Sequence, residues 1–205
     1  MSGQNAKTPK HAGISGDDGF ALQEAKKLLD ARYYCSNEEL SEAMSKWATT
    51  LLEPLVKAGS AEAQWLISGN HDGRDLTQEE MDQKHLQRLK EGAAAELPDA
   101  MFYLAHHHYE KAEYEEAAIL YRKAADTGHA YAKWCLGLDL ISGVGVAQDQ
   151  AAGLKLIEEA GNLYFEGAIQ FMSDAYALGK YGFPQDECQA ATWQRKLANK
   201  NLIRF

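Results

Sequence analysis

The stretch LISGVGVAQDQAAGLKLIEEAG, residues 140–161, decides how the chain is read, because its glycines suit either a phosphate-binding loop or a turn between two helices. A phosphate-binding loop follows a buried strand, and a Lys–Ser or Lys–Thr pair comes after its glycines. The stretch shows neither feature. Gly143 and Gly145 therefore predict a turn in which glycine supplies the backbone freedom, and Val146 is expected to fill the gap between the two helices.

An internal repeat surrounds this turn. Each repeat opens with alanine, has an apolar residue four positions later and then a small residue, and a second apolar motif precedes it. The opening residues are Ala63, Ala100, Ala132 and Ala168, which stand 37, 32 and 36 residues apart. Apolar and small residues at spacings of three and four lie on one helix face, and the small ones let two helices approach closely. Each repeat is therefore predicted to be a helical hairpin that buries its apolar face by stacking on its neighbours.

The repeat motifs resemble the Sel-1-like repeat, a relative of the tetratricopeptide repeat. The residues that carry the resemblance are Ala132, Leu136, Gly137, Gly143, Gly145, Val146 and Asp149, followed by Ala190 and Trp193. The unit from Pro98 to Gly128 is closer to the shorter tetratricopeptide form, and the unit that opens at Ala63 is degenerate. The resemblance covers residues 48–200. It implies an all-α fold, a right-handed α–α superhelix (solenoid) of about four to five helical hairpins.

The expected organisation is a disordered tail over residues 1–18 and then a single solenoid over residues 19–205. Its approximate units are a capping hairpin at 19–62 and repeats at 63–99, 100–131, 132–167 and 168–205. Asn37 is a favourable helix start, because its side chain can accept from a free backbone N–H. Pro54 is expected to kink or divide the helix that contains it.

Composition and charge narrow the function classes. The formal net charge of −9 argues against nucleic-acid binding, which needs clustered Lys and Arg, and fits a basic protein partner. We find no signal-like apolar run at the start and no eighteen-residue apolar segment, so a cytoplasmic protein without a membrane partner is expected. Three widely separated cysteines predict reduced thiols rather than a disulfide framework. No cofactor is expected.

Three consecutive histidines, His106, His107 and His108, raise a metal hypothesis. Consecutive helical residues point about 100° apart, and no histidine follows four positions after any of them, so one ion cannot gather all three. The family pattern puts His108 between the helices and His106 toward the groove, which leaves His107 facing solvent. No catalytic arrangement of Ser, His and Asp or of Cys and His stands out.

The resemblance implies that a partner binds the concave face, which the first helix of each unit builds. Transferred by alignment, the candidate partner-binding residues are Trp65, Asp72, Phe102, His106, Tyr109, Glu110, Trp134, Leu138, Gln170 and Asp174. A register shift of one residue would turn Trp65 and Trp134 from the groove into the core. A basic ridge of Lys196, Lys200 and Arg204 is expected to be a solvent-facing cap, with a partner site as the alternative.

The sequence thus favours a non-enzymatic protein–protein interaction module. Within this class, a bacterial immunity or inhibitor protein that binds a basic toxin and a regulatory adaptor fit equally well. The alternative class is a metal-dependent binder or enzyme that uses His106–His108 and nearby carboxylates. The partner and the oligomeric state stay open.

Overall fold

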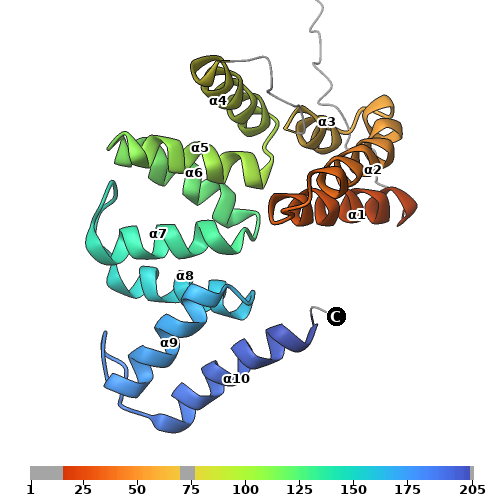
Figure 1. Ribbon diagram of the computed structural model, residues 1–205. Helices are drawn as coiled ribbons and strands as arrows, with labels where there is room; N and C mark the ends of the chain where they lie inside the picture. The colour runs from red at the N-terminus through yellow and green to blue at the C-terminus, as the bar shows by residue number, and fades with distance from the viewer. Residues whose placement is uncertain (1–15, 70–76, 204–205) are drawn as a thin grey trace, which may run out of the picture. The chain divides into compact units, whose positions relative to one another are not determined.

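The computed structural model describes residues 16–69 and 77–203, and within these ranges the chain forms ten α-helices and no strand (Figure 1). The predicted all-α fold is confirmed. The chain divides into two compact units, residues 1–76 and 77–205, which we describe separately. Most of the expected disordered tail lies outside the described residues, and residues 16–18 form the first turn of a helix.

The first unit is a helical hairpin followed by a short third helix. Its helices are α1 (Gly16–Tyr33), α2 (Glu38–Lys57) and α3 (Ala61–Ser68). Asn37 begins α2 as expected, because its Oδ1 accepts from the Leu40 N–H at 2.8 Å. Pro54 does not divide α2, which runs on to Lys57 and whose next turn is closed by an Ala58 N–H bond to the Pro54 carbonyl. Leu52 is at the centre of the small apolar core.

The second unit is a stack of helices in which each helix packs against the next along the chain. Its helices are α4 (Gln78–Ala94), α5 (Pro98–Glu110), α6 (Tyr114–Asp126), α7 (Ala130–Ser142), α8 (Gln150–Asn162), α9 (Glu166–Leu178) and α10 (Glu187–Ile203). In Figure 1, α5 with α6, α7 with α8 and α9 with α10 follow one another as hairpins. This is the expected solenoid arrangement, in which each hairpin covers the apolar face of its neighbour.

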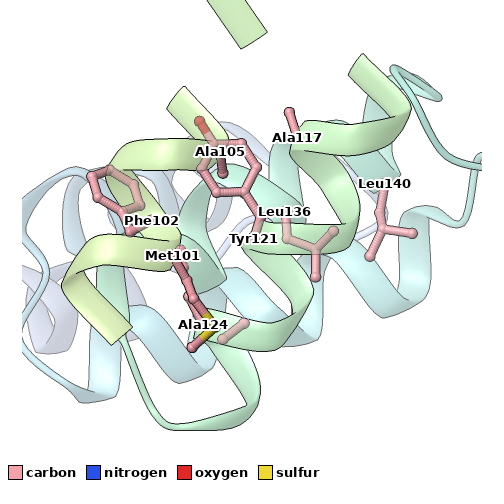
Figure 2. Close-up of a cluster of buried hydrophobic side chains, with 10 residues drawn as sticks. Met101, Phe102, Ala105, Ala117, Tyr121, Ala124, Leu136 and Leu140 are labelled. Carbon is pink, nitrogen blue, oxygen red and sulfur yellow. The ribbon is translucent and has the colours of Figure 1, made fainter. Parts of the chain in front are cut away.

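Two apolar clusters hold the second unit together. The first joins α5, α6 and α7, and Figure 2 shows Met101, Tyr121 and Leu136 converging within it. Val146 packs against this cluster, as the sequence predicted. The second cluster joins α8, α9 and α10 around Met172. Each cluster lies between successive hairpins, which is why the repeat motif places its apolar residues on both helices.

The glycines of the opening stretch form the turn between α7 and α8. Gly143 and Gly145 have φ angles of 76° and 65°, in the left-handed region that favours glycine. The N–H groups of Gly143 and Val144 donate to the Asp139 carbonyl at 2.7 and 3.1 Å and so close the end of α7. Asp149 begins α8, since its Oδ1 accepts from the Ala152 N–H at 3.0 Å. The turn assignment is confirmed.

Small residues bring α7 and α8 into close contact. A Cβ atom added at Gly153 would lie 2.5 Å from the Gly137 carbonyl oxygen and 2.8 Å from Cγ1 of Ile141. The two helix backbones therefore meet where both residues are glycine, as expected of the small positions in the repeat.

None of the helices in the described ranges combines the length and the apolar character that a membrane crossing requires.

Candidate functional site

Aromatic rings run across the second unit from α5 through α7 to α9 and the loop after it. We call this set the aromatic row, and its members are Tyr103, Phe102, Tyr131, Phe165, Trp134, Phe171 and Tyr181. The helices α5, α7 and α9 are the first helices of their hairpins. The row therefore joins equivalent elements of three successive repeats.

Ring contacts make the row continuous. Between α5 and α7, the ring centroids of Phe102 and Tyr131 lie 4.6 Å apart. Tyr131 stacks on Phe165, at the start of α9, with a centroid distance of 4.8 Å. Trp134 lies 5.8 Å from Phe165 and also 5.8 Å from Phe171. These offset and edge-to-face contacts are the geometries that aromatic pairs prefer, so they hold the rings in fixed positions.

The tyrosines of the row are more exposed than its other rings. Tyr103, Tyr131 and Tyr181 are 51%, 42% and 41% exposed, whereas Phe165 and Phe171 are half-buried. The exposed tyrosines thus rest on a layer of fixed rings. Rigid, partly exposed aromatic side chains supply contact area at a low entropic cost, which is the property of residues that anchor protein interfaces.

Phe102 differs from the sequence expectation. Its side chain is only 3% exposed, because it stacks on His129 at 4.9 Å and lies against Tyr121 and Tyr131. It is a buried member of the row and presents almost no surface to a partner. The tryptophan at the same motif position, Trp134, is half-buried, and it both contacts the row and packs against the second apolar cluster.

The remaining candidates of the second unit lie mostly at its surface. Tyr109, Glu110, Gln170 and Asp174 are exposed, and Leu138 is half-buried against the second cluster. On α9, Gln170 Nε2 donates to Asp174 Oδ1 at 2.9 Å. Tyr109 is not a member of the row, because its ring pairs with Tyr114 at 5.0 Å. The candidates therefore do not form one surface: Trp134 belongs to the aromatic row, whereas Tyr109 pairs with Tyr114 outside it.

The remaining candidates are described apart from the row, because they lie in the first unit, in the C-terminal helix or outside the described residues. Trp65 is half-buried in α3 of the first unit. Asp72 lies outside the described residues. Of the basic ridge, Lys196 contacts the Asn162 side chain and sits 3.9 Å from the centre of the Trp193 ring, while the side chains of Lys200 and Arg204 are also outside the described set.

Two of the three histidines have separate carboxylate partners, and the three do not share a common centre. His106 Nδ1 is 3.6 Å from Glu110, and His108 Nδ1 is 2.5 Å from Glu113. His107 does not face solvent as expected: its Nε2 is buried without a hydrogen-bond partner among the described residues, and burial lowers the pKa of its imidazole. Within the described residues, no three His, Cys, Asp or Glu side chains are grouped to hold a metal ion.

Helix α7 carries a buried acidic residue. Asp139 of α7 is only 5% exposed, and burial raises the pKa of its carboxyl group to about 6. Burial, followed by the charge of Asp139, raises the pKa of the Cys135 thiol to about 12. Burial is also the main reason that the pKa of Tyr121 is raised. Sequence reasoning missed this group, because an acid in an apolar helix pattern resembles a surface residue.

The sequence also missed Tyr103, Tyr131, Phe165 and Phe171. Tyr103 and Phe171 are three positions after the repeat alanines Ala100 and Ala168, whereas the candidates were taken from the position before. An alignment of the aromatic residues at both positions would have found them. Tyr131 and Phe165 precede the motif and carry no repeat signal.

Comparison with known proteins identifies the fold. No protein-family model and no curated relative matches the chain. A protective antigen present in uropathogenic Escherichia coli strains, displaying an SLR fold, is 26% identical with a TM-score of 0.57 over 74% of this chain and 33% of the antigen. A Sel1 repeat protein from Oxalobacter formigenes is 24% identical with a TM-score of 0.48, over 56% of this chain and 90% of that protein.

Stacked hairpins with a row of rings on their first helices define a helical-repeat protein. More specifically, the chain has the fold of the Sel-1-like repeat proteins, and the resemblance seen in the motifs is confirmed. The chain spans only a third of the length of the antigen that it matches.

Proposed function

We propose that the chain is a non-enzymatic interaction module that binds a protein partner along the aromatic row. The observation that carries the proposal is the continuous set of ring contacts across α5, α7 and α9, topped by three exposed tyrosines. A fold needs aromatic residues in its core, but packing between hairpins does not require tyrosines that are about half exposed. Interfaces are enriched in such anchors.

The chemistry of the partner follows from charge. Exposed acids on the same helices include Glu110, Glu166 and Asp174, and the whole chain carries a formal net charge of −9. Complementary charge speeds encounter and disfavours acidic partners. A basic protein is therefore the favoured partner. An immunity or inhibitor protein against a basic toxin and a regulatory adaptor are both forms of this function.

A metal-dependent binder or enzyme has less support in the described residues. His106 and His108 each pair with a carboxylate of their own hairpin, Glu110 and Glu113, and no third ligand joins either pair. Added zinc or nickel should leave the melting temperature unchanged, since an ion that binds the folded state selectively would raise it.

The protein-binding function is tested by capture from the native host and by surface plasmon resonance on the captured partner. Tyr131→Ala should raise the dissociation rate about tenfold or more, because truncating an aromatic anchor costs about 2 kcal/mol. Ile119→Ala is the matched control, an exposed apolar residue on α6, and it should bind like wild type. Equal dissociation rates for all three proteins would remove the aromatic row as the binding face.

A further inference from the structure

His129 links the start of helix α7 to the aromatic row. Its ring stacks on Phe102, with the centroids 4.9 Å apart and the planes inclined by 20°. Phe102 in turn contacts the exposed Tyr131, which lies in the first turn of α7, at 4.6 Å. The His129 side chain is only 17% exposed, so neighbouring groups fix its position. A movement of this ring therefore reaches an exposed tyrosine of the row through one intervening side chain.

Both ring nitrogens of His129 have a defined neighbour. Nδ1 accepts from the Ala132 N–H at 3.1 Å and so caps the start of α7. Nε2 lies 3.3 Å from Oδ1 of Asp99, in the first turn of α5. A ring nitrogen that accepts a hydrogen bond carries no proton. The cap therefore requires the neutral imidazole with its proton on Nε2, the nitrogen that faces the carboxylate.

Protonation of His129 is incompatible with this cap. The imidazolium ion carries a proton on both nitrogens, so Nδ1 would direct a donor at the Ala132 donor. Its positive charge would also lie at the positive end of the α7 dipole. Asp99 attracts the same charge from α5, so the charged ring is drawn away from the first turn of α7. Histidine is the side chain that ordinarily changes its charge between pH 5 and 8.

We propose that His129 is a proton-sensitive positioning residue of the aromatic row. The neutral ring caps α7 and holds Phe102 and Tyr131 in place. When the ring is protonated, the cap opens, the two aromatic rings shift and the partner is held less tightly. The inference rests on the proposed protein-binding function and adds regulation by pH to it.

Other titratable groups near the row have to be distinguished from His129. His106 meets the edge of Phe102, with the ring centroids 6.5 Å apart, and is an imidazole as well. Asp139, whose pKa is raised to about 6, lies ten positions after His129, about 15 Å further along α7. The charged and titratable side chains to consider are Asp99, His106 and Glu110 on α5, Asp126 on α6, and Lys133 and Asp139 on α7.

Nuclear magnetic resonance of the whole, isotopically labelled chain tests the device without a partner. At pH 8 the ring nitrogen signals of His129 should show the neutral tautomer with its proton on Nε2. As the pH falls to about 5.5, the Ala132 amide and Tyr131 ring signals should shift with the same midpoint as the His129 ring. A neutral tautomer protonated on Nδ1 would overturn the proposal, and so would a His129 titration that leaves Ala132 and Tyr131 unchanged.

His129→Asn is the matched variant, because asparagine also caps helices through its side-chain oxygen but carries no titratable group. Its Ala132 amide and Tyr131 ring signals should no longer shift over the same pH range. His106→Gln is the control: it removes the other imidazole beside Phe102 and should keep the wild-type response. A response that persists in His129→Asn, or that disappears in His106→Gln, would assign the effect to another group and overturn the proposal.

Surface plasmon resonance on the captured partner gives the second readout. The dissociation rate of the wild type should rise severalfold between pH 7.5 and about 6, and that of His129→Asn should rise less. Titration of the partner itself acts on both proteins, so equal pH dependence would show that His129 does not regulate binding. The magnetic resonance response needs no partner and would stand even if Tyr131→Ala removed the row as the binding face. The two proposals therefore fail separately.

Discussion

At the scale of single residues, Gly145 has the least room for a side chain among the described glycines. Its φ of 65° already favours glycine, and an added Cβ would lie 2.2 Å from the Tyr114 carbonyl oxygen. Strain and clash act together, so Gly145→Ala should lower the free energy of unfolding by about 2–4 kcal/mol. Chemical denaturation followed by circular dichroism measures the change.

Gly128 provides the matched control for this prediction. Its φ is 93°, but nothing lies within 4 Å of an added Cβ, so Gly128→Ala should cost only the conformational strain of about 1 kcal/mol. Equal losses of unfolding free energy in the two variants would show that the contact with Tyr114 does not contribute to the cost of Gly145→Ala.

The turn assignment also predicts that ATP or GTP does not change the melting temperature. A clear rise would restore the phosphate-loop hypothesis.

The raised pKa of Asp139 predicts how the free energy of unfolding depends on pH. Its pKa is raised from 3.8 to about 6 in the folded chain, so the folded state holds this proton more tightly than the unfolded state does. The resulting stability is complete below pH 3.8 and is lost as the pH rises through 6. Asp139→Asn should therefore raise the free energy of unfolding by about 1–3 kcal/mol at pH 7.5.

The gain from Asp139→Asn should shrink as the pH falls from 7.5 toward 4, because the wild-type carboxyl group becomes neutral in the folded state. Urea denaturation of both proteins across this range gives the comparison. A gain that does not depend on pH would mean that the carboxylate is not the cause.

At the scale of helices, packing and helix propensity predict opposite effects for a substitution at the contact between α7 and α8. Propensity alone predicts that Gly153→Ala stabilises α8 by about 1 kcal/mol. The added Cβ would meet the Gly137 carbonyl oxygen at 2.5 Å, so the helices must separate. We expect packing to dominate and Gly153→Ala to lower the free energy of unfolding by about 1–3 kcal/mol.

Ala151→Gly in the exposed part of the same helix is the counterpart of this change. It should cost at most about 1 kcal/mol through helix propensity, because Ala151 is exposed in the first turn of α8. Thermal or urea unfolding of both variants tests the argument. Stabilisation by Gly153→Ala would mean that the two helices can move apart without loss.

The helices themselves could largely be predicted from sequence, because repeat spacing, caps and glycine turns are local signals. Asn37, Gly143 and Asp149 each act at a helix end as their residue types suggest. The binding face could not be placed to the same accuracy. On a helix, neighbouring positions differ by about 100°, so the choice between Gln170 and Phe171 decides whether a side chain joins the row.

At the scale of the whole molecule, acidity and the aromatic row should control different steps of binding. The rings make short-range contacts, so they determine how long a complex lasts, whereas the charges act before contact and determine how often it forms. Salt weakens only the second effect, because the Debye length falls to about 8 Å at physiological ionic strength. The two contributions can therefore be separated kinetically.

The double variant Glu110→Lys with Asp174→Lys tests this separation. It replaces two exposed acids on α5 and α9 and changes the net charge by four, from −9 to −5. Association with the captured basic partner should slow severalfold at low salt, and the difference from wild type should fade as salt is added. Dissociation should change less than in Tyr131→Ala, since no member of the row is altered. Surface plasmon resonance at several salt concentrations separates the two rates, and equal association rates at low salt would show that the partner approaches by another face.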